Sequence, residues 1–290
     1  MDKYTGIFNT SGDVRDAVDA GSLHRPYMAI VLEPDQYIDW NGSSPVPPTP
    51  PVPPEPAYSA MPLTFEIISG GTIKWVLLKY SGDATATIQY KLNNGNWTNV
   101  TAAKSASATE IQVSAGDIIQ FRGNNSQYSV GDRDYCHFRC TAHYNAMGNV
   151  MSLINSTNYE NLTQLQSAYA FASIFCDNKG IETAENLVLP ATSLTENCYY
   201  HMFSGCTNLT VGPELLAKTL KTSSYEGMFS ECSNLSYVKC LATNMLATNC
   251  TTNWLSNVAS TGTFVKKPGA VWSTGANGIP SGWTVVNADI

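Results

Sequence analysis

Short apolar runs alternate with turn residues in the middle of the chain, between residues 58 and 143. The runs are rich in β-branched and aromatic residues and lie at 63–68, 72–78, 86–92, 110–113, 117–122 and 135–140. Turn sequences such as 69–71, 93–95 and 123–125 separate them. Runs of this length bounded by Gly, Asn and Ser are typical of strands. The spacing predicts an antiparallel β-sandwich of about 85 residues.

A 26-residue repeat occupies the segment from residue 144 to 290. Four apolar positions keep one register through three units, at 189/215/241, 194/220/246, 202/228/254 and 203/229/255. Within a unit, Leu194, Cys198 and Met202 recur every four residues, which predicts one face of a helix. Periods of about 20–29 residues are typical of leucine-rich repeats, whose units each supply a strand and a helical turn. We therefore expect an α/β solenoid with a C-terminal cap.

The first 42 residues predict a small module of one short helix, at 14–20, and two strands, at 27–32 and 37–40. A chain of this length is near the lower limit for an independent core, so we expect the module to dock on a partner or on copies of itself. The apolar and aromatic residues expected to make that attachment are Tyr27, Met28, Ile30, Leu32, Tyr37 and Trp40.

A proline-rich linker, residues 43–57, follows the module. Eight of the twelve residues from 45 to 56 are proline. Proline fixes the backbone, so the run predicts an extended polyproline spacer about 37 Å long. Proline-rich runs also serve as ligands for aromatic grooves. A single run between two apolar-rich segments favours the spacer.

Composition and charge exclude several classes. Only 13% of the residues are charged, which leaves a coat of neutral polar side chains. The formal charge of −7 gives no basic footprint for nucleic acid. No apolar run approaches the roughly 20 residues of a membrane span, so we expect no membrane insertion. The first residues hold no apolar run suited to a secretory signal, so we expect either a signal that is missing from this sequence or release by lysis.

Candidate catalytic and metal-binding residues are few. Cys136, His137, Cys140 and His143 invite zinc, but alternation along a strand puts the two thiols and the two imidazoles on opposite faces. Asp132 and Asp134 are best interpreted as parts of a solvated turn. Neither a nucleophile elbow nor a phosphate or calcium loop is present. We expect no enzyme activity, metal or cofactor.

The cysteines and aromatic residues of the repeats leave two further questions. Cys206 and Cys232 occupy equivalent positions in stacked units, within reach of a disulfide, although reduced thiols are the simpler interpretation. Tyr199, Tyr200, His201 and Tyr225 are the candidates for a partner-binding surface, because aromatic rings with polar tips grip glycans and proteins. Packing of these rings between units is the alternative for each of them.

Several short segments of the sequence resemble those of known families. The repeat words 202–209 and 228–235, the segment 187–192 and the closing segment 272–286 resemble the BspA-like leucine-rich repeat proteins of gut Bacteroidales. The segments 122–126 and 148–153 resemble a module often found ahead of those repeats. The segment 24–29 is similar to N-terminal attachment modules of virion proteins of crAss-like phages that infect Bacteroides.

These resemblances imply a non-enzymatic virion protein, a head fibre or capsid decoration. Residues 1–42 would bind a capsid or other virion protein, and the head would meet host-surface or mucosal glycans or proteins. The resemblance to phage fibres implies a homotrimer. Several copies of the head would then bind the surface together, with a higher avidity than one weak contact provides. The alternative is a bacterial cell-surface adhesin of the BspA-like kind. A glycan-processing enzyme, acting through Asp132 or Asp134, is the third class.

Overall fold

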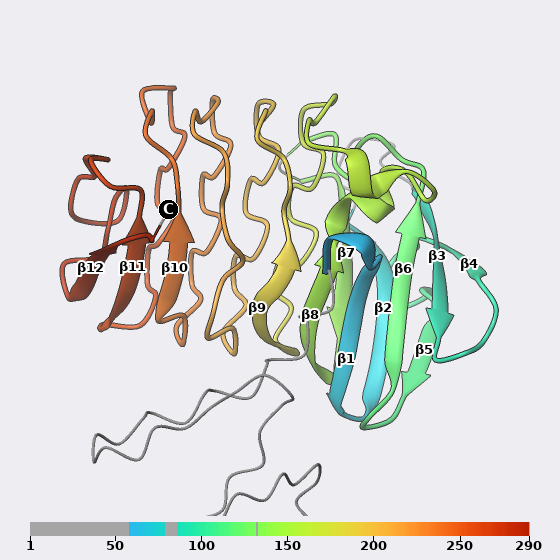
Figure 1. Cartoon of the computed structure of the whole chain (residues 1–290). Coiled ribbons are helices and arrows are strands. Elements are labelled where there is room, and N and C mark those ends of the chain that lie inside the picture. The colour runs from blue at the N-terminus through green and yellow to red at the C-terminus, as the bar shows by residue number, and fades with distance from the viewer. Residues whose placement is uncertain (1–57, 79–85, 132, 290) are drawn as a thin grey trace, which may run out of the picture. The chain divides into compact units, whose positions relative to one another are not determined.

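The computed structural model describes residues 58–78, 86–131 and 133–289. The N-terminal module, with Tyr27, Met28, Ile30, Leu32, Tyr37 and Trp40, and the linker at 43–57 lie outside the described residues. The described chain is mainly β, with three sheets and no α-helix (Figure 1). Its only helical elements are the short 3-10 turns η1 (Tyr58–Ala60), η2 (Val150–Leu153) and η3 (Tyr159–Asn161).

The largest sheet has six strands in the order β4-β3-β6-β1-β8-β9. Their bounds are β4 (Thr98–Thr101), β3 (Thr87–Leu92), β6 (Ile118–Gly123), β1 (Leu63–Ser69), β8 (His143–Asn149) and β9 (Ile181–Val188). All neighbours are antiparallel except β8 and β9, which run parallel. Alternate residues of β1 and β6 are buried, as expected for a sheet with one face on a core.

A three-stranded antiparallel sheet, β5-β2-β7, packs against the first. It consists of β5 (Glu110–Val113), β2 (Gly71–Leu78) and β7 (Tyr135–Cys140). Phe65 of β1 and Phe138 of β7 meet between the sheets, with ring centroids 5.1 Å apart. The six strands predicted between residues 58 and 143 are confirmed, with ends shifted by at most one residue. Strand β4 was not predicted.

The third sheet lies in the repeats and is parallel, in the order β10-β11-β12. Its strands are β10 (Tyr237–Cys240), β11 (Gly262–Lys266) and β12 (Trp283–Asn287). Single bridges continue the parallel pairing upstream, including Leu189 with Leu215 and Val211 with Tyr237. Successive units therefore lie side by side in chain order from β9 to β12 (Figure 1).

The helix predicted in each unit is wrong. Residues 197, 201 and 205 have positive φ, and so do the equivalent residues 223, 227 and 231. A left-handed residue at every fourth position ends each turn, so the backbone forms consecutive four-residue turns. Their N–H groups donate alternately to a carbonyl of the same turn and to a carbonyl of the next unit. Met202 donates to Tyr199 of its own turn (3.1 Å), and Phe203 donates to Met228 of the next unit (2.8 Å). The i, i+4 apolar spacing follows this period of four, because the same spacing in an α-helix drifts about 40° per step.

Stacked aromatic rings join the two sheets to the repeats. Phe138 of β7 stacks on Phe175, which stacks on Phe203 and then Phe229, with centroids 5.7, 5.2 and 5.4 Å apart. A second row of rings comprises Trp75, Tyr128, Phe171, Tyr199, Tyr225, Trp254 and Trp272. The core is therefore continuous. Strands β8 and β9 also extend the six-stranded sheet past residue 143, where the sequence placed the end of the sandwich.

Candidate functional site

The predicted partner-binding residues divide into two pairs. Tyr199 and Tyr225 are each 1% exposed and belong to the second row of stacked rings, so burial removes them from a binding surface. Tyr200 and His201 are half-buried neighbours with ring centroids 4.3 Å apart. The period of four explains the difference, because the positions of Tyr199 and Phe203 face the core in every unit. Packing between units is thus the role of Tyr199 and Tyr225.

The Tyr199 hydroxyl is buried and has no hydrogen-bond partner in the described part of the chain. We expect Tyr199→Phe to leave the free energy of unfolding unchanged or to raise it by about 1 kcal/mol, because it removes an unsatisfied polar group. Tyr128→Phe is the matched control, since the Tyr128 hydroxyl donates to the Leu153 carbonyl over 2.6 Å. Its loss should cost about 1–2 kcal/mol in urea denaturation. Equal losses in both variants would contradict the prediction.

The cysteines are free thiols, including Cys206 and Cys232, for which the sequence left a disulfide open. Each donates instead to a carbonyl of the preceding unit, at Phe175 and Phe203, over 3.0 Å. Burial raises the pKa of the Cys198 and Cys240 thiols to about 12. Since the thiolate is the reactive form, buried thiols of this kind serve packing rather than nucleophilic catalysis.

The Cys/His segment around β7 does not converge on one point. The Nδ1 atom of His137 lies 3.2 Å from the Cys176 carbonyl oxygen, while that of His143 lies 2.5 Å from a Glu182 carboxylate oxygen. In the described part of the chain, no three His, Cys, Asp or Glu side chains are grouped to hold a metal ion. Asp132 lies outside the described residues, and Asp134 is 7% exposed, which corrects the expected solvated turn at that residue.

The pKa of His137 is shifted by its surroundings. Burial lowers the pKa of this imidazole below its usual value of 6.5, although the hydrogen bond with the Cys176 backbone acts to raise it. A histidine whose folded-state pKa is depressed contributes stability above pH 6.5, and this stability is lost as the pH falls. We expect His137→Gln to flatten the loss of stability between about pH 6.5 and 5 in urea denaturation. His143→Gln is the control, and an unchanged pH slope in His137→Gln would contradict the prediction.

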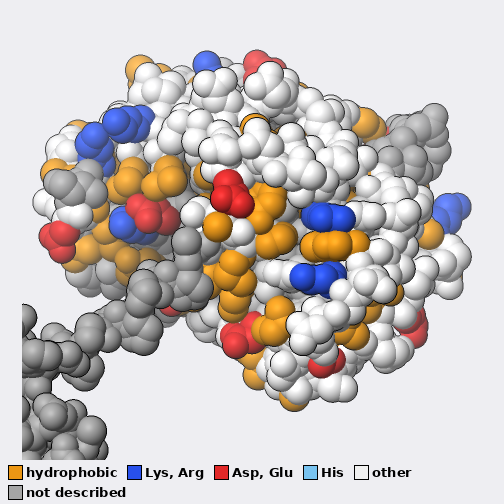
Figure 2. All heavy atoms as spheres, turned by 45° about the vertical axis from the view of Figure 1, so that its right-hand side comes forward, with side chains coloured by type: hydrophobic (Ala, Val, Ile, Leu, Met, Phe, Trp, Pro, Cys, Tyr) orange, Lys and Arg blue, Asp and Glu red, His pale blue; other side chains and the backbone are white. Residues whose placement is uncertain are grey.

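The outward face of the six-stranded sheet carries a neutral polar surface over β3, β4 and β6. Gln89 pairs with Asn99 on one side and Arg122 on the other, and Lys91 pairs with Gln120. These residues alternate with the buried ones and therefore point away from the core. Figure 2 shows basic and hydrophobic side chains lying beside one another within a largely uncharged surface.

Trp97 lies between two cations on this face. The guanidinium carbon of Arg122 is 4.1 Å from the centroid of the Trp97 ring, and the Lys91 ammonium is 5.3 Å from it. Both distances fall within the range of cation–π contacts, about 6 Å. We call Lys91, Trp97 and Arg122 the Trp97 cluster. This cluster was not predicted from the sequence. The alternation of polar and apolar residues in 86–92 and 117–122 does place Lys91 and Arg122 on the polar faces of their strands.

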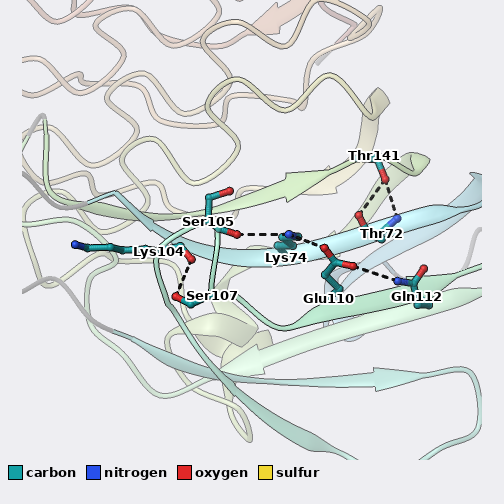
Figure 3. A network of polar contacts seen from close by, with 8 residues as sticks. All are labelled: Thr72, Lys74, Lys104, Ser105, Ser107, Glu110, Gln112 and Thr141. Carbon is teal, nitrogen blue, oxygen red and sulfur yellow. Dashed lines mark hydrogen bonds and ion pairs between the residues drawn. The ribbon is translucent and has the colours of Figure 1, made fainter.

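The outward face of the three-stranded sheet has a different charge pattern (Figure 3). Lys74 forms an ion pair of 2.7 Å with Glu110 of the neighbouring strand and also donates to the Ser105 carbonyl. Gln112 donates to the same carboxylate. The Lys74 charge is thus paired with a carboxylate of the same surface.

Two shallow hollows mark the surface. One, of about 240 Å³, lies beside the Trp97 cluster and is lined by Thr87, Ile88, Gln89, Asn99, Gly123, Asn124 and Asn125. The other, of about 380 Å³, lies at the C-terminal cap beside Leu246 and Val271. Leu246 is 91% exposed, although its equivalents Leu194 and Leu220 are buried, because the cap that follows the last unit covers Trp254 and not Leu246.

Comparison with known proteins finds no matching family model, no matching curated protein and no matching solved structure. Among the described residues, none of the helical segments is long and apolar enough to cross a membrane.

Proposed function

We propose that the protein is a non-enzymatic virion protein, a head fibre or capsid decoration of a phage that infects Bacteroides. In this proposal residues 1–42 attach it to a capsid or other virion protein. The proline-rich linker holds the rest away from the particle, and the described part is the binding head. The stacked units of that head would form a leucine-rich repeat solenoid of the BspA-like kind.

The continuous core of the head is the observation that carries the proposal. The row of rings from Phe138 to Phe229 runs from the three-stranded sheet into the repeats without a break, and Phe65 of the six-stranded sheet packs on Phe138. A head with one continuous core presents its outer faces as a single unit. Its polar outer faces suit contact with glycans or proteins of the host surface, and three copies on one fibre would multiply weak contacts.

The test is the composition of infectious particles. We expect mass spectrometry of density-purified virions to find peptides from residues 58–289 at a fixed ratio to the major capsid protein. Electron cryo-microscopy of the same particles should show the head projecting from an ordered attachment site. Absence of the chain from infectious particles, with its recovery in host cell envelopes instead, would overturn the proposal in favour of the bacterial adhesin.

A further inference from the structure

The Trp97 cluster holds two positive charges against one ring. Two lysines elsewhere in the described chain pair with carboxylates: Lys74 is 2.7 Å from Glu110 and Lys239 is 3.0 Å from Glu214. Within the described ranges, Lys91 and Arg122 form no such pair. The two cations lie 4.1 and 5.3 Å from the same ring centroid, so they repel each other across it. An external anion would remove the repulsion.

The guanidinium of Arg122 is held in place for such an anion. Its Nε donates to the Gln89 side-chain oxygen over 2.8 Å, and Gln89 in turn donates to Asn99 over 3.0 Å. The same guanidinium lies over the Trp97 ring. One edge of the guanidinium is therefore fixed by the protein, and its terminal N–H groups remain for a carboxylate or sulfate, which arginine binds in a bidentate manner.

The hollow beside the cluster supplies neutral hydrogen-bonding groups. Gln89 and Asn99 belong to both the hollow and the network that orients Arg122. Asn99 accepts from Gln89 through its side-chain oxygen, which leaves its amide N–H groups as donors for a ligand. The volume of about 240 Å³ is below the roughly 300 Å³ at which pockets for drug-sized molecules begin. It suits a single sugar ring with its hydroxyl groups.

We propose that the Trp97 cluster and the adjoining hollow bind one acidic sugar unit of a glycan chain. The carboxylate or sulfate would lie on Arg122 and Lys91, and the ring hydroxyls would meet Gln89, Asn99 and Asn124. Two cations in a neutral surface do not make the basic stripe that nucleic acid needs. The inference extends the proposed function, for which acidic mucosal or cell-surface glycans are the natural source, but the binding can be measured on the isolated chain.

Isothermal titration calorimetry of the full chain tests the site. The probes are a chondroitin sulfate hexasaccharide, its chemically desulfated form, neutral maltohexaose and single-stranded DNA. We expect Arg122→Gln and Lys91→Gln each to weaken binding of the acidic hexasaccharide about tenfold, the effect of losing one charge-assisted hydrogen bond. Lys104→Gln is the matched control, because it removes the same charge from an exposed loop residue and should leave the affinity unchanged.

The outcomes separate the alternatives. Binding of the sulfated form alone assigns a sulfate, binding of the desulfated form as well assigns the carboxylate, and either supports the site. Equal binding of maltohexaose, tighter binding of DNA, or equal losses in Arg122→Gln and Lys104→Gln would overturn it. No binding of either acidic form by a chain with native thermal stability would overturn it too. A failure here leaves the virion assignment standing, because that depends on particle composition.

Discussion

Replacing Phe175 by alanine is expected to destabilise the two sheets and the repeats together, by about 3–5 kcal/mol. Phe175 is fully buried and stacks between Phe138 of β7 and Phe203 of the first complete repeat. Its removal opens a cavity where the two parts share one core. Because that core is continuous, hydrogen exchange followed by mass spectrometry should show peptides from β1 and β2 and from residues 225–255 losing protection in one step.

Phe264→Ala is the control for this prediction. Phe264 is also fully buried, but it lies in β11 near the C-terminal cap, against Trp254 and Trp272. We expect this cavity to raise exchange mainly in β11 and β12, with less effect on the sheets at the other end of the stack. If Phe175→Ala unfolded the repeats while β1 and β2 kept their protection, the shared core would not couple the two parts.

Strand positions were predictable from the sequence because alternation and turn residues act locally. All six runs between 58 and 143 became strands, and the Asn-Asn-Gly turn at 93–95 joins β3 to β4. Strand β4 was missed because its four residues, 98–101, bury only Val100 and so show no apolar run. The repeat period also predicted which units stack, since equal spacing brings equivalent residues together.

The conformation inside each repeat was not recognised, although the sequence carries a signal for it. Asn197, Gly205 and Gly227 lie at the left-handed positions, and Asn249, Asn253 and Asn257 do so in the last unit. Asn and Gly tolerate positive φ better than other residues. A helix would hardly place them at every fourth position. The spacing of the apolar residues fits either a helix or a series of four-residue turns. The Asn and Gly residues at the left-handed positions favour the turns.

The Trp97 cluster was beyond the reach of sequence reasoning for a different reason. Lys91 lies in β3, Trp97 in the loop between β3 and β4, and Arg122 in β6. Their contact therefore depends on the register of β3 with β6. A shift of one residue would turn Arg122 toward the core. Register is fixed by the packing of Phe121 and Ile119 inside, which a linear pattern does not show.

Gly148→Ala is expected to cost about 3 kcal/mol or more, because two separate penalties coincide at this residue. Gly148 has φ +80° in β8, and a Cβ atom there would lie 2.1 Å from the Pro62 carbonyl oxygen. That oxygen belongs to the backbone, so relief requires moving the start of β1 away from β8. Urea denaturation of the variant should show a lowered midpoint, and hydrogen exchange should show lost protection in β8 and β9 first.

Gly116→Ala separates the two penalties. Gly116 has φ +86°, close to that of Gly148, but no atom lies within 4 Å of a Cβ placed there. The control therefore carries the backbone strain alone, about 1 kcal/mol. The difference between the two variants measures the close approach of Pro62 to β8. Equal losses would mean that the segment before β1 yields freely at that point, which would contradict the prediction.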